Sequence, residues 1–307
     1  MPIEPVDAHS LEKAIIDEAF WVMGFDRRPW LRRMAEPLFR LPIGRFSRLA
    51  AYFENSVAQK GLHDAIGDFM SQFVFDIDII GAENLPAEGP LLIAANHPAA
   101  YDFFLIAATL PRDDMKLVAS NINIVRRLPA TADHFIFIGS KEVMGDTHSR
   151  MAAVRASLRH LKQGGALLIF PTGTVDPDPA VYPEGARQSL KNWSPSLDLF
   201  VRRVPETKIV VTIVSGVLSK RWYKSPVTWL RQEPHNKQKV AEIFQVMQQL
   251  YFPNTIKLRP CLSFSRPLTV DLLRGGESQD DIVPTLITEA QTQLEFHPGF
   301  SMIEDRS

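Results

Sequence analysis

The chain has 307 residues, of which 45% are hydrophobic and 22% are charged, and its formal net charge is −1. This composition is typical of a folded globular protein and excludes an intrinsically disordered one. The nearly neutral charge argues against a whole-protein electrostatic grip on nucleic acid, and no known nucleic-acid-binding motif is present. We therefore expect no nucleic acid among its partners.

The number of cysteines and the lengths of the apolar stretches indicate the cellular compartment in which the protein is expected. A single cysteine, Cys261, excludes an intramolecular disulfide, and no Cys/His cluster suggests a metal. A reducing, cytoplasmic compartment fits this pattern. The first twenty residues carry acidic side chains instead of an apolar core, so we expect no signal peptide. The most apolar stretch, residues 91–110, is broken by polar residues and a proline, so we expect no membrane span.

Residues 10–72 predict a helical N-terminal region. Apolar residues recur at helical spacing in residues 11–20 and again in residues 49–57. Three prolines are expected to divide this region into short helices because proline disrupts a helix interior. They are Pro29, Pro37 and Pro42.

From residue 73 onward, strand-like stretches alternate with helical patterns. The predicted strands are residues 73–80, 91–95, 116–119, 135–138, 166–170, 209–214 and 256–264. The clearest helix runs from a cap at Asp146 or Thr147 to Gly164, and another covers residues 240–250. This alternation predicts an α/β fold with a mixed, largely buried sheet flanked by helices.

The first chemically informative group is the segment from Asn96 to Asp102. The apolar residues 91–95 end just before His97, and Pro98 suits the first turn of a helix, so we expect His97 at a strand-to-helix corner. Asp102 then lies one turn beyond Pro98, where its carboxylate is placed to accept a hydrogen bond from the imidazole. This contact fixes the tautomer and leaves the other ring nitrogen to act as a general base.

The same spacing at His63 and Asp68 provides a comparison. It lies within a segment that predicts continuous helix, where side chains five residues apart lie on different faces and should not pair. For His97 and Asp102, the alternative is a helix-start residue and a solvated charge, but the strand-to-helix context favours the functional interpretation. No Gly-x-Ser-x-Gly motif is present, and Cys261 lies in a strand-like run, so we expect the substrate's own hydroxyl or amine to be the nucleophile.

A second group of residues, Phe170-Pro171-Thr172-Gly173-Thr174, follows a buried strand. Pro171 stiffens the chain where it leaves the sheet, and Gly173 allows main-chain N–H groups to approach a ligand closely. Such a turn is suited to an anionic group or a developing oxyanion. Taken alone, however, the pattern favours a plain strand-to-loop turn.

Together, the two groups resemble the glycerolipid acyltransferase family, which acylates glycerol phosphate and lysophosphatidate. Residues 81–97 look like the family's entry into its His-x4-Asp motif, and residues 170–174 resemble its Phe-Pro-Glu-Gly-Thr block. Further resemblance is found at residues 209–214 and 264–268, so that it covers about residues 73–270. We accordingly predict a helical region over residues 1–72, an acyltransferase domain over 73–272 and a C-terminal helical tail over 273–307.

The resemblance implies an enzyme of phospholipid biosynthesis. It would move a fatty acyl group from acyl-CoA or acyl carrier protein to a hydroxyl of a glycerolipid-type acceptor, with no metal and no bound cofactor. His97 is the implied general base, oriented by Asp102. The implied substrate-binding residues are Asn96, Lys141, Phe170, Pro171, Thr172, Gly173 and Thr174.

Two departures from the family pattern concern the acceptor. Thr172 stands where the family has Glu, and the Arg that binds the acceptor's phosphate is missing after residues 135–138. Lys141 supplies a point charge there but not the bidentate fork of Arg. Arg126 and Arg127 are alternative cations, and Glu184 is an alternative carboxylate. These departures leave open a non-catalytic lipid-binding relative and an acyltransferase acting on a non-phosphate acceptor.

Residues 27–48 contain seven arginines interleaved with large apolar residues, and a smaller basic and aromatic patch covers residues 220–231. Arginine beside tryptophan and phenylalanine suits docking onto an anionic lipid surface. It is equally consistent with apolar residues that pack on the catalytic layer beneath solvated arginines. On the first interpretation, we expect a cytoplasmic protein peripherally associated with the inner face of the membrane.

Overall fold

The computed structural model describes residues 6–120, 122–139, 147–274, 282–298 and 300. The chain forms two compact units, each assembled from separate stretches of sequence. Unit 1 comprises Met1–Asp76, Ile122–Ala132 and Val217–Arg259, and unit 2 comprises Ile77–Asn121, Asp133–Gly216 and Pro260–Ser307. The domain limits predicted at residues 72 and 272 stay a prediction, because compactness alone does not define an independently folding domain.

Unit 2 is built on a seven-stranded sheet with the order β1-β7-β6-β2-β5-β3-β4. Neighbouring strands are parallel except β6 and β7, which are antiparallel, so the predicted mixed sheet is confirmed. The strands are β1 (Asp78–Ile80), β2 (Leu91–Ala95), β3 (Lys116–Ser120), β4 (Phe135–Ile138), β5 (Ala166–Ile169), β6 (Lys208–Ser215) and β7 (Cys261–Phe264).

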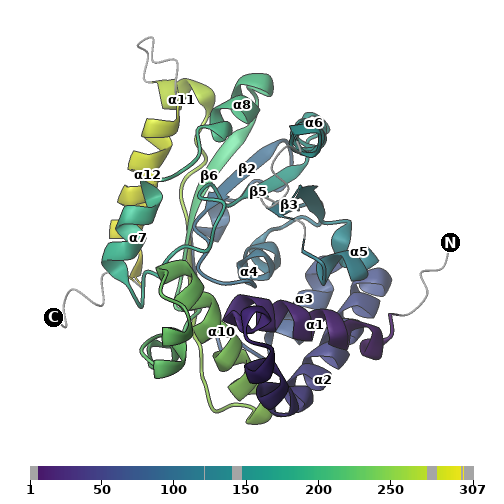
Figure 1. The fold of residues 1–307 in the computed structure, drawn as a ribbon. Helices are drawn as coiled ribbons and strands as arrows, with labels where there is room; N and C mark the ends of the chain where they lie inside the picture. Colours follow the sequence, from purple (N-terminus) through teal and green to yellow (C-terminus); the bar gives the residue numbers. More distant parts are fainter. Residues whose placement is uncertain (1–5, 121, 140–146, 275–281, 299, 301–307) are drawn as a thin grey trace. The chain divides into compact units, whose positions relative to one another are not determined.

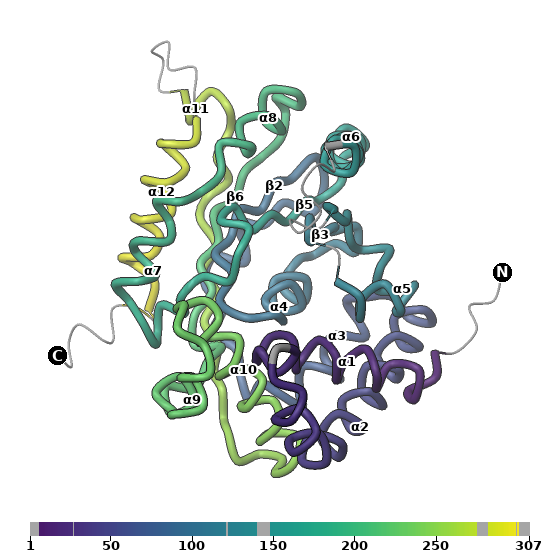
Figure 2. Tube along the Cα trace, viewed as in Figure 1, coloured from purple at the N-terminus to yellow at the C-terminus, as the bar shows by residue number. Residues whose placement is uncertain are grey.

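Helices flank this sheet. They are α4 (Asp102–Thr109), α6 (Thr147–Lys162), α7 (Pro183–Leu190), α8 (Ser196–Arg203), α11 (Val270–Arg274) and α12 (Val283–Glu295). Figure 2 shows α7 and α12 side by side although about a hundred residues separate them in sequence. In Figure 1, α4 lies on the opposite side of the strands from α12. The predicted α/β class with flanking helices is therefore confirmed.

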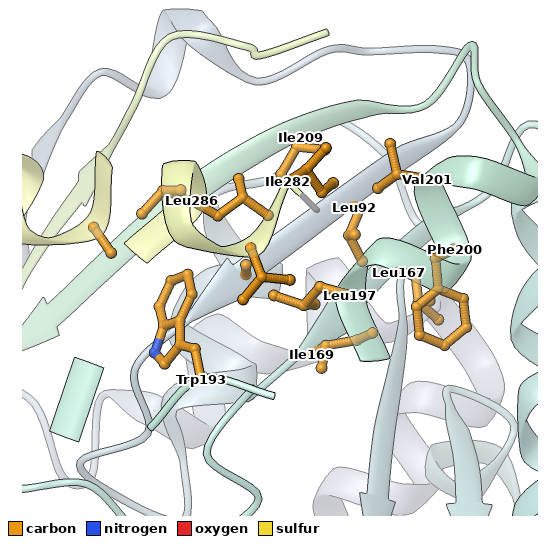
Figure 3. Packing of buried hydrophobic residues seen from close by; sticks show 14 of the residues in the cluster. Leu92, Leu167, Ile169, Trp193, Leu197, Phe200, Val201, Ile209, Ile282 and Leu286 are labelled. Atoms are coloured by element: carbon orange, nitrogen blue, oxygen red, sulfur yellow. The ribbon is translucent and has the colours of Figure 1, made fainter. Parts of the chain in front are cut away.

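One face of the sheet packs into a single apolar cluster with these helices. Leu92, Leu167 and Ile209, from β2, β5 and β6, are fully buried there against Leu197 of α8 and Leu286 of α12 (Figure 3). Alternate residues of each strand point to this face because the side-chain period of a strand is two. Every residue of β2 and β5 is buried, as expected for central strands covered on both faces. The cluster makes β2 and β5 a rigid support for the residues that follow them.

Unit 1 is helical in its described part. Its elements are α1 (Ala8–Met23), η1 (Phe25–Arg27), α2 (Pro29–Lys60), α3 (Leu62–Met70), η3 (Val125–Arg127), α5 (Pro129–Ala132), α9 (Lys220–Tyr223), η4 (Pro226–Leu230) and α10 (Pro234–Tyr251). Asp7 caps the start of α1 by accepting from the Ser10 N–H, and Gly24 ends it with φ of 78°. None of the described helices is both long enough and apolar enough to cross a membrane.

The prediction that prolines divide residues 29–60 into short helices is wrong. Pro29 begins α2, but Pro37 and Pro42 lie inside this one helix of 32 residues. Pro42 has no N–H to donate to the Leu38 carbonyl one turn earlier. The Tyr251 hydroxyl donates to that carbonyl at 2.5 Å instead, so the helix continues without losing the hydrogen bond. A partner this distant in sequence is invisible to a local pattern.

Two predicted strands are shorter than expected. The N–H groups of Phe73 and Val74 both donate to the Met70 carbonyl, so the segment predicted to begin a strand closes a turn after α3, and β1 begins at Asp78. Similarly, β7 begins only after Pro260, which has no N–H for a ladder. The cap residue predicted at Asp146 lies outside the described residues.

Candidate active site

The candidate site lies where three neighbouring strands end. β2 is paired in parallel with β5 on one side and β6 on the other. Their carboxyl ends therefore meet at one edge of the sheet, where ligands commonly bind in α/β proteins. Asn96 and His97 follow β2, Phe170 follows β5, and Gly216 follows β6. The two groups of residues predicted from sequence are thus brought to the same edge.

Asn96 joins the end of β2 to β6. Its side-chain N–H donates to the Val214 carbonyl at 2.9 Å, and its side-chain oxygen accepts from the Val214 N–H at 2.7 Å. The amide thereby repeats the pattern of a strand ladder one residue beyond the last paired residue, Ala95. Asn96 is also buried, at 2% exposure. Both polar ends of the amide bind protein main chain, and its role as a substrate-binding residue stays a prediction.

His97 and Asp102 contact each other as predicted, but the geometry of the corner differs. The imidazole Nδ1 lies 3.1 Å from Asp102 Oδ2, which also accepts from the Ala99 N–H at 2.8 Å. We expected Pro98 to start the helix, but α4 begins at Asp102 itself, after a turn over residues 99–101. Asp102 therefore lies in the first turn of α4, where the helix dipole favours a negative charge.

Asp102 is a fully buried carboxylate. Burial raises its pKa well above the ordinary value; the hydrogen bond from Ala99 opposes this rise, and the nearby Asp178 and Asp176 charges add to it. Its second oxygen, Oδ1, is buried and has no hydrogen-bond partner among the described residues. Burial thus disfavours the charged form of Asp102, and a cation beside the carboxylate would favour that form.

The ring of Phe170 stacks on the face of the His97 imidazole. The two ring centroids are 4.1 Å apart and the planes are inclined by 12°, which is a stacked arrangement. Together with the Nδ1 contact, this stacking fixes both the plane and the rotation of the imidazole. The His97 side chain nevertheless remains 22% exposed, so solvent reaches part of the ring.

The turn after β5 is closed by its own hydrogen bonds. Gly173 has φ of 65°, and its N–H donates to the Phe170 carbonyl at 3.0 Å. The Thr174 N–H lies 3.5 Å from the Thr172 hydroxyl oxygen. The first N–H is used within the turn, and the second faces Thr172. The anion-binding turn and the alternative of a plain strand-to-loop turn both stay predictions.

Two aspartates that the sequence analysis missed lie just beyond this turn. Asp176 Oδ2 accepts from the His97 N–H at 2.9 Å, and the Asp176 N–H donates to the His97 carbonyl at 2.8 Å. Asp178 Oδ1 accepts from the Gly216 N–H and from the Ala180 N–H, both at 2.9 Å. Both aspartates are buried, at 2% and 0% exposure. The signal was the Asp-Pro-Asp-Pro run directly after the second group, since two acids in a stiff loop need partners for their burial.

Residues 76–215 match the family model described as Acyltransferase, and this range contains both groups of site residues. Residues 76–215 are similar to acyltransferase domains. For this part of the chain, the match bears out the acyltransferase family and enzyme class predicted from the sequence. No curated protein matches the chain. Among solved structures, the chain is similar to the 1-acyl-sn-glycerophosphate (LPA) acyltransferase PlsC from Thermotoga maritima. The two sequences are 14% identical, the match covers 92% of this chain and 96% of that chain, and the TM-score is 0.48.

The residues that the sequence offers for binding the acyl acceptor lie in different parts of the acyltransferase. Lys141 falls outside the described residues. Arg126 and Arg127 belong to η3 in unit 1, whereas the site lies in unit 2. Glu184 is an exposed residue in the first turn of α7, 3.8 Å from Arg187 in the next turn, which is the position of an ordinary helix-surface ion pair.

The second His-x4-Asp spacing of the acyltransferase provides an internal comparison. His63 and Asp68 both lie in α3, and both are exposed. Asp68 forms an ion pair with Lys60 at 3.0 Å. Within the described residues, no group of three His, Cys, Asp or Glu side chains is arranged to hold a metal ion.

Proposed function

We propose that His97 is the general base of an O-acyl transfer from acyl-CoA or acyl carrier protein to a glycerolipid-type hydroxyl, that of glycerol phosphate or a lysophospholipid. His97 takes the hydroxyl proton at Nε2 while the acceptor oxygen attacks the thioester carbonyl. A C–O bond forms, and the C–S bond breaks when the tetrahedral intermediate collapses. The imidazolium then returns its proton to the departing thiolate, which leaves as a free thiol.

The observation that carries this proposal is the contact between Nδ1 of His97 and the buried carboxylate of Asp102 at 3.1 Å. With the proton of the neutral ring held on Nδ1, basicity is directed to Nε2. Asp102 then stabilises the imidazolium that forms during attack. The stacked Phe170 ring supports the proposal further, because a base held in one orientation loses little entropy on reaching the transition state.

Replacing the imidazole tests the assignment directly. We expect full-length His97→Ala to release free thiol from an acyl thioester in the presence of acceptor ~10²–10⁴-fold more slowly than the wild type. The matched control is His63→Ala, which removes an exposed histidine of the same spacing from α3 and should leave turnover unchanged. Near-normal turnover of His97→Ala would remove the assignment.

We further propose that α2 docks the enzyme on the surface of an anionic membrane. Trp30, Met34 and Leu38 recur at every fourth residue and are 64%, 69% and 66% exposed, so they form an apolar stripe along this helix. Arg33 and Arg40 on the same helix are exposed. Exposed apolar side chains that alternate with arginines favour insertion into the boundary between headgroups and acyl chains.

A matched pair of leucines tests the docking surface. Leu38 of α2 and Leu272 of α11 are each 66% exposed, but only Leu38 belongs to the proposed stripe. We expect Leu38→Ser to weaken co-sedimentation with phosphatidylglycerol vesicles by roughly 5–10-fold, because about half of the transfer free energy of a leucine side chain is lost. Leu272→Ser should bind as the wild type does. Equal binding by both variants would contradict the assignment to α2.

A second candidate acceptor is an uncharged hydroxyl, such as that of a lyso-lipid without a phosphate or of a sugar. The observation that favours it is the negative field of the site, because Asp178 and Asp176 both raise the pKa of Asp102. A phosphate dianion entering this field is repelled unless a cation accompanies it. Comparing kcat/KM for glycerol phosphate, lysophosphatidate and monoacylglycerol separates the candidates, since the substrate with the largest kcat/KM identifies the acceptor class.

A further inference from the structure

We infer that Asp176 is a positioning residue that holds the main chain of His97 at the angle needed for proton transfer. The inference deepens the proposed function, since it rests on His97 as the base. Asp176 is distinct from Asp102: it binds the peptide groups of His97, whereas Asp102 binds its ring. Asp176 therefore fixes the position of the His97 main chain, and Asp102 fixes the orientation of the His97 ring.

The grip on His97 is reciprocal. The His97 N–H donates to the Asp176 side chain at 2.9 Å, and the Asp176 N–H donates to the His97 carbonyl at 2.8 Å. Two hydrogen bonds on opposite sides of one Cα restrict rotation about both main-chain dihedrals of that residue. His97 follows the last strand-paired residue by only two positions, so this grip acts where the sheet ladder no longer holds the chain.

The same carboxylate joins the two groups of site residues. The Thr172 hydroxyl lies 3.1 Å from Asp176 Oδ2, the atom that accepts from the His97 N–H, and also 3.1 Å from the Thr174 carbonyl oxygen, so the two oxygens share its one proton. Thr172 stands where the resembling family has Glu. In this chain, an acid is therefore present four residues later, and the threonine hydroxyl orients it. The departure at Thr172 is matched by Asp176, which provides a physical reason why a threonine is tolerated there.

Burial of this acid carries a cost that the contacts to His97 offset. Desolvation raises the pKa of Asp176, while the hydrogen bond from the His97 N–H and the charge of the His97 imidazolium lower it. A buried acid held by main-chain N–H groups keeps its place only while those donors stay aligned. Displacing His97 thus costs free energy at both ends of the contact, so the stiffness of the corner comes from this pair.

The test compares kcat and KM of full-length variants in the free-thiol assay. Asp176→Ala removes the side-chain acceptor of the His97 N–H and keeps the main-chain N–H that donates to the His97 carbonyl. We expect kcat to fall ~10²-fold with KM changed less than about 3-fold, the size expected for a displacement of about 1 Å at a reacting group. Asp176→Asn keeps an acceptor oxygen in the same place and should restore kcat to within about 10-fold of the wild type. The matched control is Glu54→Ala, which removes a buried acid that binds main-chain N–H groups in unit 1.

The control separates positioning from general support of the fold. Glu54 accepts from the Ala130 and Thr131 N–H groups in unit 1, so its removal should lower the thermal midpoint without a comparable loss of kcat. Equal losses of kcat in Asp176→Ala and Glu54→Ala, tracking equal losses of thermal midpoint, would overturn the inference. If Asp176→Ala does not fold, Asp176→Glu keeps the charge but moves the acceptor by one methylene. A wild-type kcat in that variant would also overturn it.

Failure of the proposed function gives a different result. If His97→Ala turns over normally, the base is misassigned whatever Asp176 does. If His97→Ala is inactive while Asp176→Ala keeps a wild-type kcat, the base stands and only the positioning role fails.

Discussion

A buried histidine behind the site makes the free energy of unfolding depend on pH. His297 follows α12 and is fully buried, with its Nε2 2.7 Å from the Ser215 hydroxyl and its Nδ1 2.8 Å from the Ser263 hydroxyl. It thus links the ends of β6 and the middle of β7. Burial lowers the pKa of His297 from 6.5 to about 4, so the folded protein holds this ring neutral at pH values where the unfolded chain protonates it.

The sign and size of the effect follow from proton linkage. Between pH 6.5 and pH 4 the unfolded chain binds more protons at this residue, so the free energy of unfolding falls as the pH falls through that window. At about 1.4 kcal/mol per pH unit, the interval corresponds to about 3 kcal/mol. The stabilisation is fully present above pH 6.5 and is lost as the pH approaches 4.

Urea unfolding at several pH values between 7 and 4 measures this contribution. We expect the free energy of unfolding of the wild type to fall more steeply with decreasing pH than that of His297→Gln, by roughly 1 kcal/mol per pH unit near pH 5. His63→Gln removes an exposed histidine and should keep the wild-type slope. Parallel curves for the wild type and His297→Gln would refute the reasoning, because the buried ring would then titrate as it does in the unfolded chain.

Two further predictions concern single side chains. Phe170→Ala removes the ring stacked on His97 at 4.1 Å. We expect kcat in the thiol-release assay to fall about 2–10-fold, the equivalent of about 0.5–1.5 kcal/mol for an aromatic pair. An unchanged kcat would mean that Asp102 alone orients the ring. Glu54→Gln replaces a buried acid that accepts from the Ala130 N–H, the Thr131 N–H and the Thr131 hydroxyl in unit 1. We expect urea unfolding to show that the free energy of unfolding falls by about 1.5–3 kcal/mol. An unchanged free energy of unfolding would show that a neutral acceptor serves equally well.

The sequence predicts well those features that depend on a local pattern. The apolar runs of β2 and β5 give their limits to within one residue, because central strands must be apolar on both faces. The contact between His97 and Asp102 also follows from local sequence, since five residues span the corner between a strand and a helix. Even there the helix start was misplaced by four residues, because Pro98 favours a first turn without requiring one.

Features that depend on distant partners could not be read from the sequence. The contact of the Asn96 amide with the main chain of Val214, more than a hundred residues later, has no signal in the local sequence. Pro42 looks like a helix breaker until Tyr251 supplies the missing donor. The Asp-Pro-Asp-Pro run points to burial of Asp176 but not to its partner, because that partner is the main chain of His97, and main-chain groups are the same in every residue.

Buried acids recur in this protein as anchors for main-chain N–H groups, and their partners distinguish their roles. Glu54 and Asp178 bind N–H groups of residues without titratable side chains, so their contribution is to hold segments together. Asp176 makes the same kind of contact, but to the histidine. Asp102 adds a ring nitrogen to its N–H donor and keeps one buried oxygen with no partner in the described part of the chain. On the proposed mechanism, a proton taken up by the imidazole places positive charge beside Asp102 Oδ2, so this buried acid would stabilise the charge that develops on His97.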